Sequence, residues 1–227
     1  VDGSLGNIMI GEGAGGAAWS NSAVSNYNVG IGYETMRGVL NGALDNVAVG
    51  KDSLKDLTTG DDNVAVGTGA AENLTTGKEN VAIGSGAYAT ANTSENYGVA
   101  VGFNAANLLD GIDNVTAVGH SALSTMVAVD GNTAVGFEAG KVTTGANNTY
   151  LGFKAGKGAS GAEGGNTGVG SRALESVTTG SSNVVVGNQA GDTITDGGEN
   201  VIVGDGAGQT TTSVAQAVII GRGAAQN

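Results

Sequence analysis

The chain repeats one short pattern of apolar and polar residues from end to end. A typical unit begins with Asn63, Val64, Ala65, Val66 and Gly67, an apolar run of three residues between an asparagine and a glycine, and continues with a longer polar stretch. These apolar runs are short, rich in β-branched residues and bounded by Gly and Asn, which is typical of strands and not of helices. The pattern therefore predicts an all-β fold.

The glycine that closes each apolar run marks the repeat. It recurs as Gly11, Gly32, Gly50, Gly67, Gly84, Gly102, Gly119, Gly136, Gly152, Gly170, Gly187, Gly204 and Gly221. The first interval is longer than the others, and from Gly32 onward the spacing stays at about 17 residues. A fixed period of this length is typical of stacked repeats, so we expect residues 1–227 to form a single repetitive domain.

A unit of about 17 residues has room for one narrow coil. The apolar run predicts one strand, and a small residue three positions after the closing glycine, such as Ala70 or Ala87, predicts a second short strand. Polar segments such as Thr58, Thr59 and Gly60 predict the turns between them. The expected fold is a parallel β-solenoid of about 13 coils with a period of about 17 residues.

An asparagine near the start of nearly every unit predicts a ladder along the stack. Side-chain amides at one position of successive coils can donate to and accept from one another. The residues that we assign to this structural ladder are Asn46, Asn63, Asn80, Asn96, Asn114, Asn132, Asn148, Asn166, Asn183 and Asn200.

The middle residue of the apolar run is never charged. We expect the two flanking aliphatic residues to face the coil interior and the middle residue to face outward. A narrow chain has no second layer of its own that could bury an apolar outer face. We therefore expect other copies of the chain to bury it, in a closed homo-oligomer. The predicted intersubunit seam is Ala48, Ala65, Ala82, Ala100, Ala117, Ala134, Tyr150, Val185, Ile202 and Ile219.

Composition and charge exclude several classes of protein. The chain has 43 glycines but no proline, which excludes collagen, and its formal net charge of −12 disfavours binding to nucleic acid. No apolar stretch is long enough to insert in a membrane. With one histidine, His120, and no cysteine, we expect neither an enzyme nor a His/Cys metal site, and no cofactor.

Two phrases resemble a known family of repeats. The segments "NVAVGKDSLKDLTTGDDNVAVG" (46–67) and "NTAVGFEAGKVTTGANNTYLG" (132–152) are similar to the head repeats of trimeric autotransporter adhesins and to repeats in bacteriophage tail fibres. The resemblance implies a left-handed β-roll, a homotrimer, and attachment to a cell-surface glycan or protein receptor. It also implies an extracellular location, on a virion or a cell surface.

Two rows of side chains are candidate binding sites. Aromatic residues follow the closing glycine in four successive units, at Phe103, His120, Phe137 and Phe153. We expect these rings to stack, and a stacked stripe either stabilises the coils or binds sugar rings. Acidic residues precede the asparagines at Asp45, Asp62, Glu79, Glu95 and Asp113. This row is solvated at a turn or is a weak candidate for Ca²⁺.

Other assignments remain open at this stage. A self-assembling extracellular filament would have the same repeats and would dock coil to coil. Threonine pairs such as Thr58 and Thr59, or Thr178 and Thr179, are compatible with an ice-binding solenoid, although turn chemistry also explains them. The leading hypothesis is a structural fibre or adhesin segment.

Overall fold

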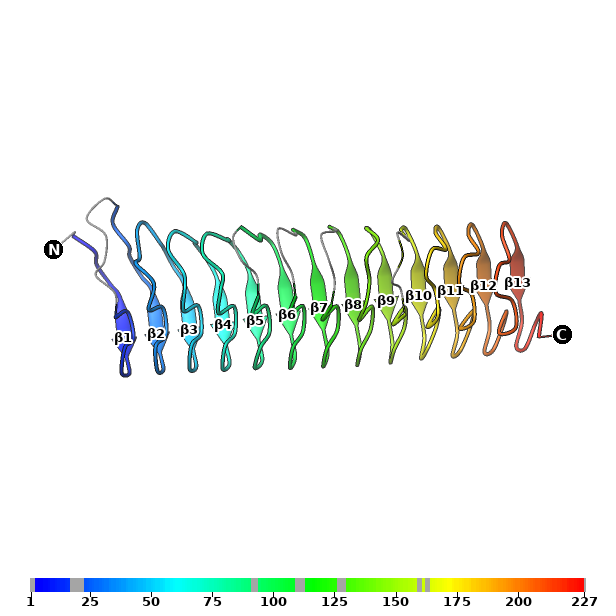
Figure 1. The fold of residues 1–227 in the computed structure, drawn as a ribbon, viewed down its shortest axis with the longest axis horizontal. Coiled ribbons are helices and arrows are strands. Elements are labelled where there is room, and N and C mark those ends of the chain that lie inside the picture. Colours follow the sequence, from blue (N-terminus) through cyan, green and yellow to red (C-terminus); the bar gives the residue numbers. More distant parts are fainter. Residues whose placement is uncertain are drawn as a thin grey trace. The chain divides into compact units, whose positions relative to one another are not determined.

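Three-residue strands are the regular elements of this protein. The structure is a computed structural model and describes residues 3–16, 23–90, 94–108, 113–125, 130–158, 161 and 164–226, which contain no helix. The strands, shown in Figure 1, are β1 (Ile8–Ile10), β2 (Val29–Ile31), β3 (Val47–Val49), β4 (Val64–Val66), β5 (Val81–Ile83), β6 (Val99–Val101), β7 (Thr116–Val118), β8 (Thr133–Val135), β9 (Thr149–Leu151), β10 (Thr167–Val169), β11 (Val184–Val186), β12 (Val201–Val203) and β13 (Val218–Ile220).

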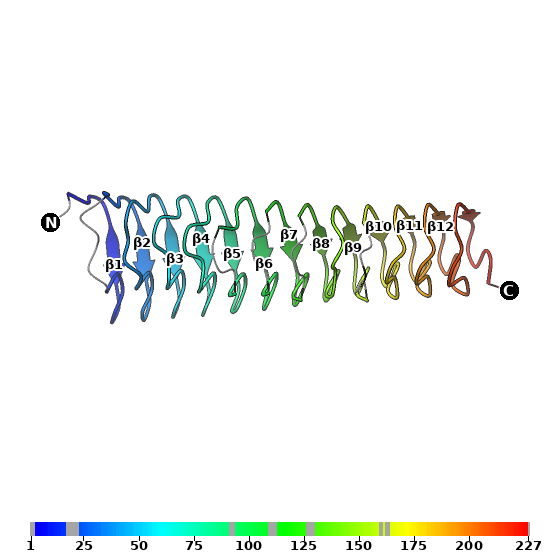
Figure 2. The ribbon, with the colours of Figure 1, turned by 45° about the horizontal axis from the view of Figure 1, so that its top comes forward.

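The chain forms two compact units, Val1–Val115 and Thr116–Asn227. In the first unit β1 to β6 pair in chain order, and in the second unit β7 to β13 do the same, every pair being parallel. Figure 2 shows loops that leave the sheet and return to it, for example between β3 and β4 in the first unit and between β11 and β12 in the second. After a longer first interval, successive strands begin about 17 residues apart. The predicted parallel β-solenoid and its period are confirmed.

The second strand predicted in each unit is a turn instead. Alternate residues after the closing glycine have positive φ angles, as at Asp52 (56°) and Leu54 (47°). Such residues cannot continue an extended strand. The backbone still links the coils, because Asp52 N donates to Tyr33 O at 2.9 Å and Leu54 N donates to Ala70 O at 3.0 Å.

The strands face the opposite way from the prediction. The middle residue points into its own coil and the flanking residues point outward, so β4 has a buried Ala65 between the more exposed Val64 and Val66. The predicted seam residues Ala48, Ala65, Ala82, Ala100, Ala117, Ala134, Tyr150, Val185 and Ile202 are at most 1% exposed, and Ile219 is half-buried. The predicted intersubunit seam is therefore wrong for these residues, which form the core.

Lack of space inside the coil is the physical reason for this orientation. Protein interiors are close-packed, so a narrow coil takes the small middle residue more readily than two β-branched residues. Larger middle residues occur at Met9, Tyr150, Val185, Ile202 and Ile219. The largest of them is Tyr150 in β9, and glycines make room for its ring. A Cβ atom on Gly156 would overlap the Tyr150 ring, and Cβ atoms on Gly140 and Gly168 would lie 3.0 and 3.2 Å from that ring.

Candidate functional site

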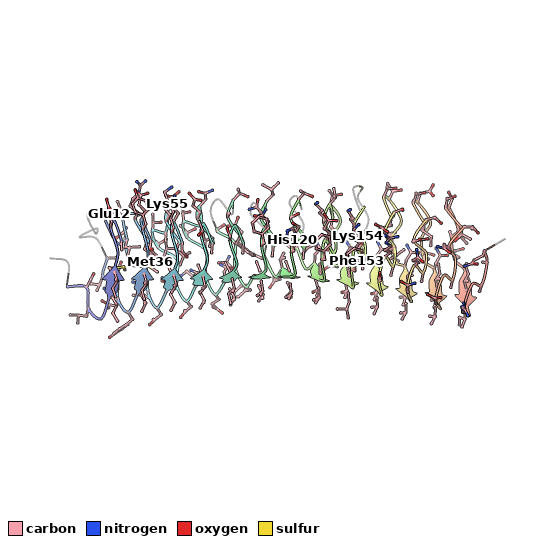
Figure 3. All side chains as sticks on the ribbon, turned by 90° about the horizontal axis from the view of Figure 1, so that it is seen from below. Glu12, Met36, Lys55, His120, Phe153 and Lys154 are labelled. Carbon is pink, nitrogen blue, oxygen red and sulfur yellow. The ribbon has the colours of Figure 1, made fainter. Side chains whose placement is uncertain are left out.

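The outer sheet face is the most regular surface of the described chain. We use this name, in each of the two units, for the first and third residues of its described strands, which lie outside the coil. Many are strongly exposed, among them Ile8 (51%), Ile31 (39%), Ile83 (40%), Leu151 (46%) and Val201 (39%). Figure 3 shows side chains extending from the strands on the side away from the loops.

The composition of the outer sheet face differs between the two units. In the first unit all of its residues are Val or Ile, namely Ile8, Ile10, Val29, Ile31, Val47, Val49, Val64, Val66, Val81, Ile83, Val99 and Val101. In the second unit Thr116, Thr133, Thr149 and Thr167 begin β7 to β10, and every other outward residue is Val, Leu or Ile. No charged residue lies on the face, so it suits an apolar, regularly spaced partner.

Sequence reasoning missed this face because it reversed the strands. The signal that could have found it is side-chain size: the middle position of a strand is mostly Ala or Gly in β2 to β8, whereas the flanking positions there are Val, Ile or Thr. Small residues are what a crowded interior selects.

Buried asparagines form a hydrogen-bonded ladder beside the strands. In the first unit it consists of Asn28, Asn46, Asn63 and Asn80, and in the second of Asn132, Asn148, Asn166, Asn183 and Asn200, all at most 1% exposed. Asn63 Nδ2 donates to Asn46 Oδ1 at 2.9 Å and to Gly77 O at 2.7 Å. Asn63 Oδ1 accepts from both N and Nδ2 of Asn80. The ladder thus satisfies buried backbone groups as well as side chains.

Asn96 and Asn114 lie outside the ladder, contrary to the prediction. Members of the ladder stand four residues before the closing glycine, and the residues at that position in the β6 and β7 coils are Gly98 and Val115. Asn96 instead donates from Nδ2 to Ser94 O at 2.7 Å. Asn114 is exposed with a φ of 58°.

Tyr88 fills the gap that Gly98 leaves in the ladder. Gly98 N still donates to Asn80 Oδ1 at 2.9 Å, but a Cβ atom on Gly98 would overlap the Tyr88 hydroxyl. Burial raises the pKa of Tyr88, and the nearby carboxylates of Glu95 and Asp113 raise it further. The tyrosine therefore stays neutral and fills the space of the missing side chain, but among the described residues its buried hydroxyl has no hydrogen-bond partner, so it does not replace the amide.

The aromatic stripe is a ring stack in the second unit. His120 and Phe137 have ring centroids 5.2 Å apart, and Phe137 and Phe153 have centroids 5.4 Å apart. Lys154 Nζ lies 5.0 Å from the centroid of Phe153, on the loop side of the strands (Figure 3). Phe103 belongs to the first unit and is 50% exposed.

The stack covers both faces of Phe137. Because a sugar ring packs against the face of an aromatic ring, this geometry favours stabilisation of the coils by stacking. Glycan binding at the stripe stays a prediction.

The five acidic residues predicted to form one row are divided among three positions. Asp45, Asp62 and Glu79 directly precede ladder residues and have φ angles of 57° to 58°. Glu95 stands further back, is buried, and its carbonyl accepts from Asn80 Nδ2 at 2.7 Å. Asp113 Oδ1 accepts from Asn96 N at 2.8 Å. In the part of the chain that the structure describes, no three His, Cys, Asp or Glu side chains are close enough together to hold a metal ion.

Threonines at the turns hydrogen bond within the stack. Thr58 Oγ1 donates to Thr75 O at 2.9 Å, and Thr178 Oγ1 donates to Thr195 O at 3.0 Å. These hydroxyls link a turn to the next coil. They do not form the free, flat array that ice binding would need.

An ion-pair cluster links two coils of the second unit. Glu138 lies 2.7 Å from Lys141 Nζ and 2.8 Å from Lys157 Nζ. Hydrogen bonds from these two lysines lower the pKa of Glu138 from 4.5 to about 2.

Replacing Glu138 by glutamine should make the second unit less sensitive to acid. A carboxylate with a lowered pKa contributes stability above its unfolded pKa, and that stability is lost as the pH falls from about 4.5 to about 2. We expect Glu138→Gln to reduce the free energy of unfolding at pH 7 by about 1 kcal/mol or less, since the pair is partly exposed. At pH 2 the difference from the wild type should vanish. Urea unfolding at both pH values measures this, and an equal difference at pH 7 and pH 2 would contradict it.

A polar groove of about 410 Å³ lies on the second unit. Its lining includes Gln189, Asp205, Gln209, Arg222 and Gln226. Gln226 Nε2 donates to Gln209 Oε1 at 3.2 Å, and Arg222 Nε lies 3.7 Å from Asp205 Oδ2. The lining includes one basic and one acidic side chain, so its charged residues have no net charge.

No family model, no curated protein and no solved structure matches this chain. The described residues include no helix that could cross a membrane. Among the described surfaces, the outer sheet face stands out because its exposed residues include no charged side chain and are mostly aliphatic.

Proposed function

We propose that the chain is a non-enzymatic structural segment of an extracellular fibre or adhesin, in which three copies associate through their outer sheet faces. Attachment to a cell surface, through a glycan or protein receptor, is the purpose that the resemblance to adhesin heads and tail fibres implies. The number of chains and the left-handed coil rest on the same resemblance. One observation carries the association itself: an outer sheet face that has no charged residue and an aliphatic residue at the third position of every described strand.

The extent of the outer sheet face supports association. The six strands of the first unit present 12 outward side chains and the seven strands of the second unit present 14. A stable protein interface uses about 20 to 30 residues from each partner, so each unit offers about half of such an interface. Exposed apolar patches of this size are uncommon on monomers.

The distribution of charge also supports association at this face. The chain has 21 Asp and Glu residues against 9 Lys and Arg residues, a formal net charge of −12. Copies of an acidic chain repel one another through most of their surface. The outer sheet face carries no charge, so it is where copies can approach without that repulsion.

A lysine on the outer sheet face should separate the copies. Ile83 is 40% exposed at the end of β5, so Ile83→Lys leaves the coil core intact but buries an unpaired charge in any interface. We expect association to weaken at least about 100-fold, since burying an unpaired charge costs roughly 3 kcal/mol or more. Light scattering over a range of concentrations measures the change, starting from a wild-type mass of three 21.9 kDa chains.

Ser85→Lys is the matched control for this experiment. Ser85 is exposed two residues further along, in the turn and off the outer sheet face, and its substitution adds the same charge. We expect Ser85→Lys to keep the wild-type mass. A wild type that stays monomeric at every concentration would overturn the proposed function, and electron micrographs of the same sample would identify end-to-end filaments.

A further inference from the structure

The threonines of the outer sheet face form one block in the second unit. Strand pairing sets Thr116 beside Thr133, Thr133 beside Thr149, and Thr149 beside Thr167. The block ends where Thr167 pairs with Val184, and Val201 and Val218 continue the row. The companion row is aliphatic throughout, from Val118 to Ile220. Over four strands the outer sheet face of this unit therefore has a row of hydroxyls beside an aliphatic row, and over the next three strands both rows are aliphatic.

The four hydroxyls of this block differ from the turn threonines. Thr58 and Thr178 use their hydroxyls to bind the next coil. Among the described residues, Thr116, Thr133, Thr149 and Thr167 make no such side-chain hydrogen bond, and they point away from the coil. Within the described chain these four hydroxyls do not hydrogen bond to their own coil, so they are available to a partner or to water.

We propose that the threonine block fixes the register of association, with equivalent coils at the same level, in the parallel arrangement that three copies around one axis require. This inference rests on the proposed function, in which a second copy of the chain covers the outer sheet face. A second copy is the occupant that the charge pattern favours, and it repeats along its length with the same coil spacing of about 4.8 Å.

The hydrogen bonding of its hydroxyls is what makes the block favour in-register packing over a slipped arrangement. A hydroxyl both donates and accepts, so in-register copies can satisfy their threonines by hydrogen bonding to one another or to water held between them at the same level. A slip of one coil places Thr167 at the level of Val184 of the second copy, where an aliphatic surface offers no partner. A buried hydroxyl without a partner costs enough to change an equilibrium about tenfold or more.

Cysteine cross-linking tests the register directly, because the natural chain contains no cysteine. Val135→Cys and Val203→Cys place single thiols on the outer sheet face of β8 and β12, four coils and about 19 Å apart. The two variants are co-expressed with different tags and treated with a thiol cross-linker that spans less than two coils. We expect links between identical positions to exceed links between different positions by about tenfold or more.

Two further variants make the test specific to the hydroxyls. Replacing all four threonines by valine keeps the β-branched shape, and we expect it to keep association but to reduce the preference for identical positions to about twofold or less. Replacing all four by serine keeps the hydroxyls, and we expect the preference to remain. That combination supports the proposal.

Other outcomes separate this inference from the proposed function. Wild-type oligomers that link different positions as readily as identical ones, or a valine variant with unchanged preference, overturn the register proposal and leave association standing. A monomeric wild type overturns both. A monomeric wild type that shows thermal hysteresis of freezing, with that activity lost in the valine variant, would show that the outer sheet face binds ice. That outcome would also overturn both.

Discussion

Replacing Asn183 by alanine is expected to lower the free energy of unfolding by about 4 kcal/mol. The substitution removes the donation from Nδ2 to Asn166 Oδ1 and to Gly197 O, and the acceptance from N and Nδ2 of Asn200. Asn200 N and Gly197 O then lack their partners in a buried site. A buried polar group without a partner costs about 1 to 3 kcal/mol, so the loss is well above that of an ordinary hydrogen bond.

Asn114→Gly is the control for this prediction. Asn114 is exposed, lies outside the ladder and has a φ of 58°, which glycine tolerates. We expect the control to change the free energy of unfolding by about 0.5 kcal/mol or less. Urea unfolding followed by circular dichroism measures both variants. Equal losses in Asn183→Ala and Asn114→Gly would show that the buried amides do not hold the stack together.

Replacing Gly136 by alanine should destabilise the stack by about 2 to 6 kcal/mol. Gly136 has a φ of 140°, a conformation that residues with a side chain rarely adopt and that costs about 1 to 3 kcal/mol. Its Cβ atom would lie 2.6 Å from Gly152 C and 3.3 Å from Phe153 N in the next coil. Because these are backbone atoms, the coils would have to move apart, and overpacking of this kind costs about a further 1 to 3 kcal/mol.

Two glycine variants separate backbone strain from the clash between coils. Gly221 has a φ of 124°, but the nearest atom to its Cβ position is 4.0 Å away. Gly69 lies inside the first unit with a φ of 63°, and the atom nearest its Cβ position is in the flexible side chain of Glu72. We expect Gly221→Ala and Gly69→Ala each to cost about 1 to 2 kcal/mol. Thermal unfolding of the three variants measures the difference, and a similar loss in all three would mean that close stacking at the closing glycine is not limiting.

The closing glycines explain why the fold was predictable from the sequence. They have φ angles from 124° to 146°, which favour glycine at one position in every coil. A position that tolerates only glycine leaves a regular mark in the sequence, and equal spacing of such marks implies equal coils. The same reasoning applies to the asparagines, because a buried amide at one level requires a partner at the next.

The exact ladder was less predictable because asparagine has other uses. Asn96 and Asn114 lie within two residues of the ladder position but serve turns. Counting four residues back from Gly102 and Gly119 would have identified Gly98 and Val115 instead. No pattern in the sequence indicates that the Tyr88 hydroxyl occupies the space beside Gly98, since that contact depends on how the coil folds back on itself.

By itself, the sequence determined the parallel stack, its period and the short strands, because each depends on local backbone demands that recur at fixed spacing. Only the tertiary structure decided which side of each strand faces inward. A strand of three apolar residues has the same polarity on both sides, so the pattern alone cannot distinguish Ala65 inside from Ala65 outside. The interior volume of the closed coil determines which side chains fit inside it, and that volume is defined only by the folded coil.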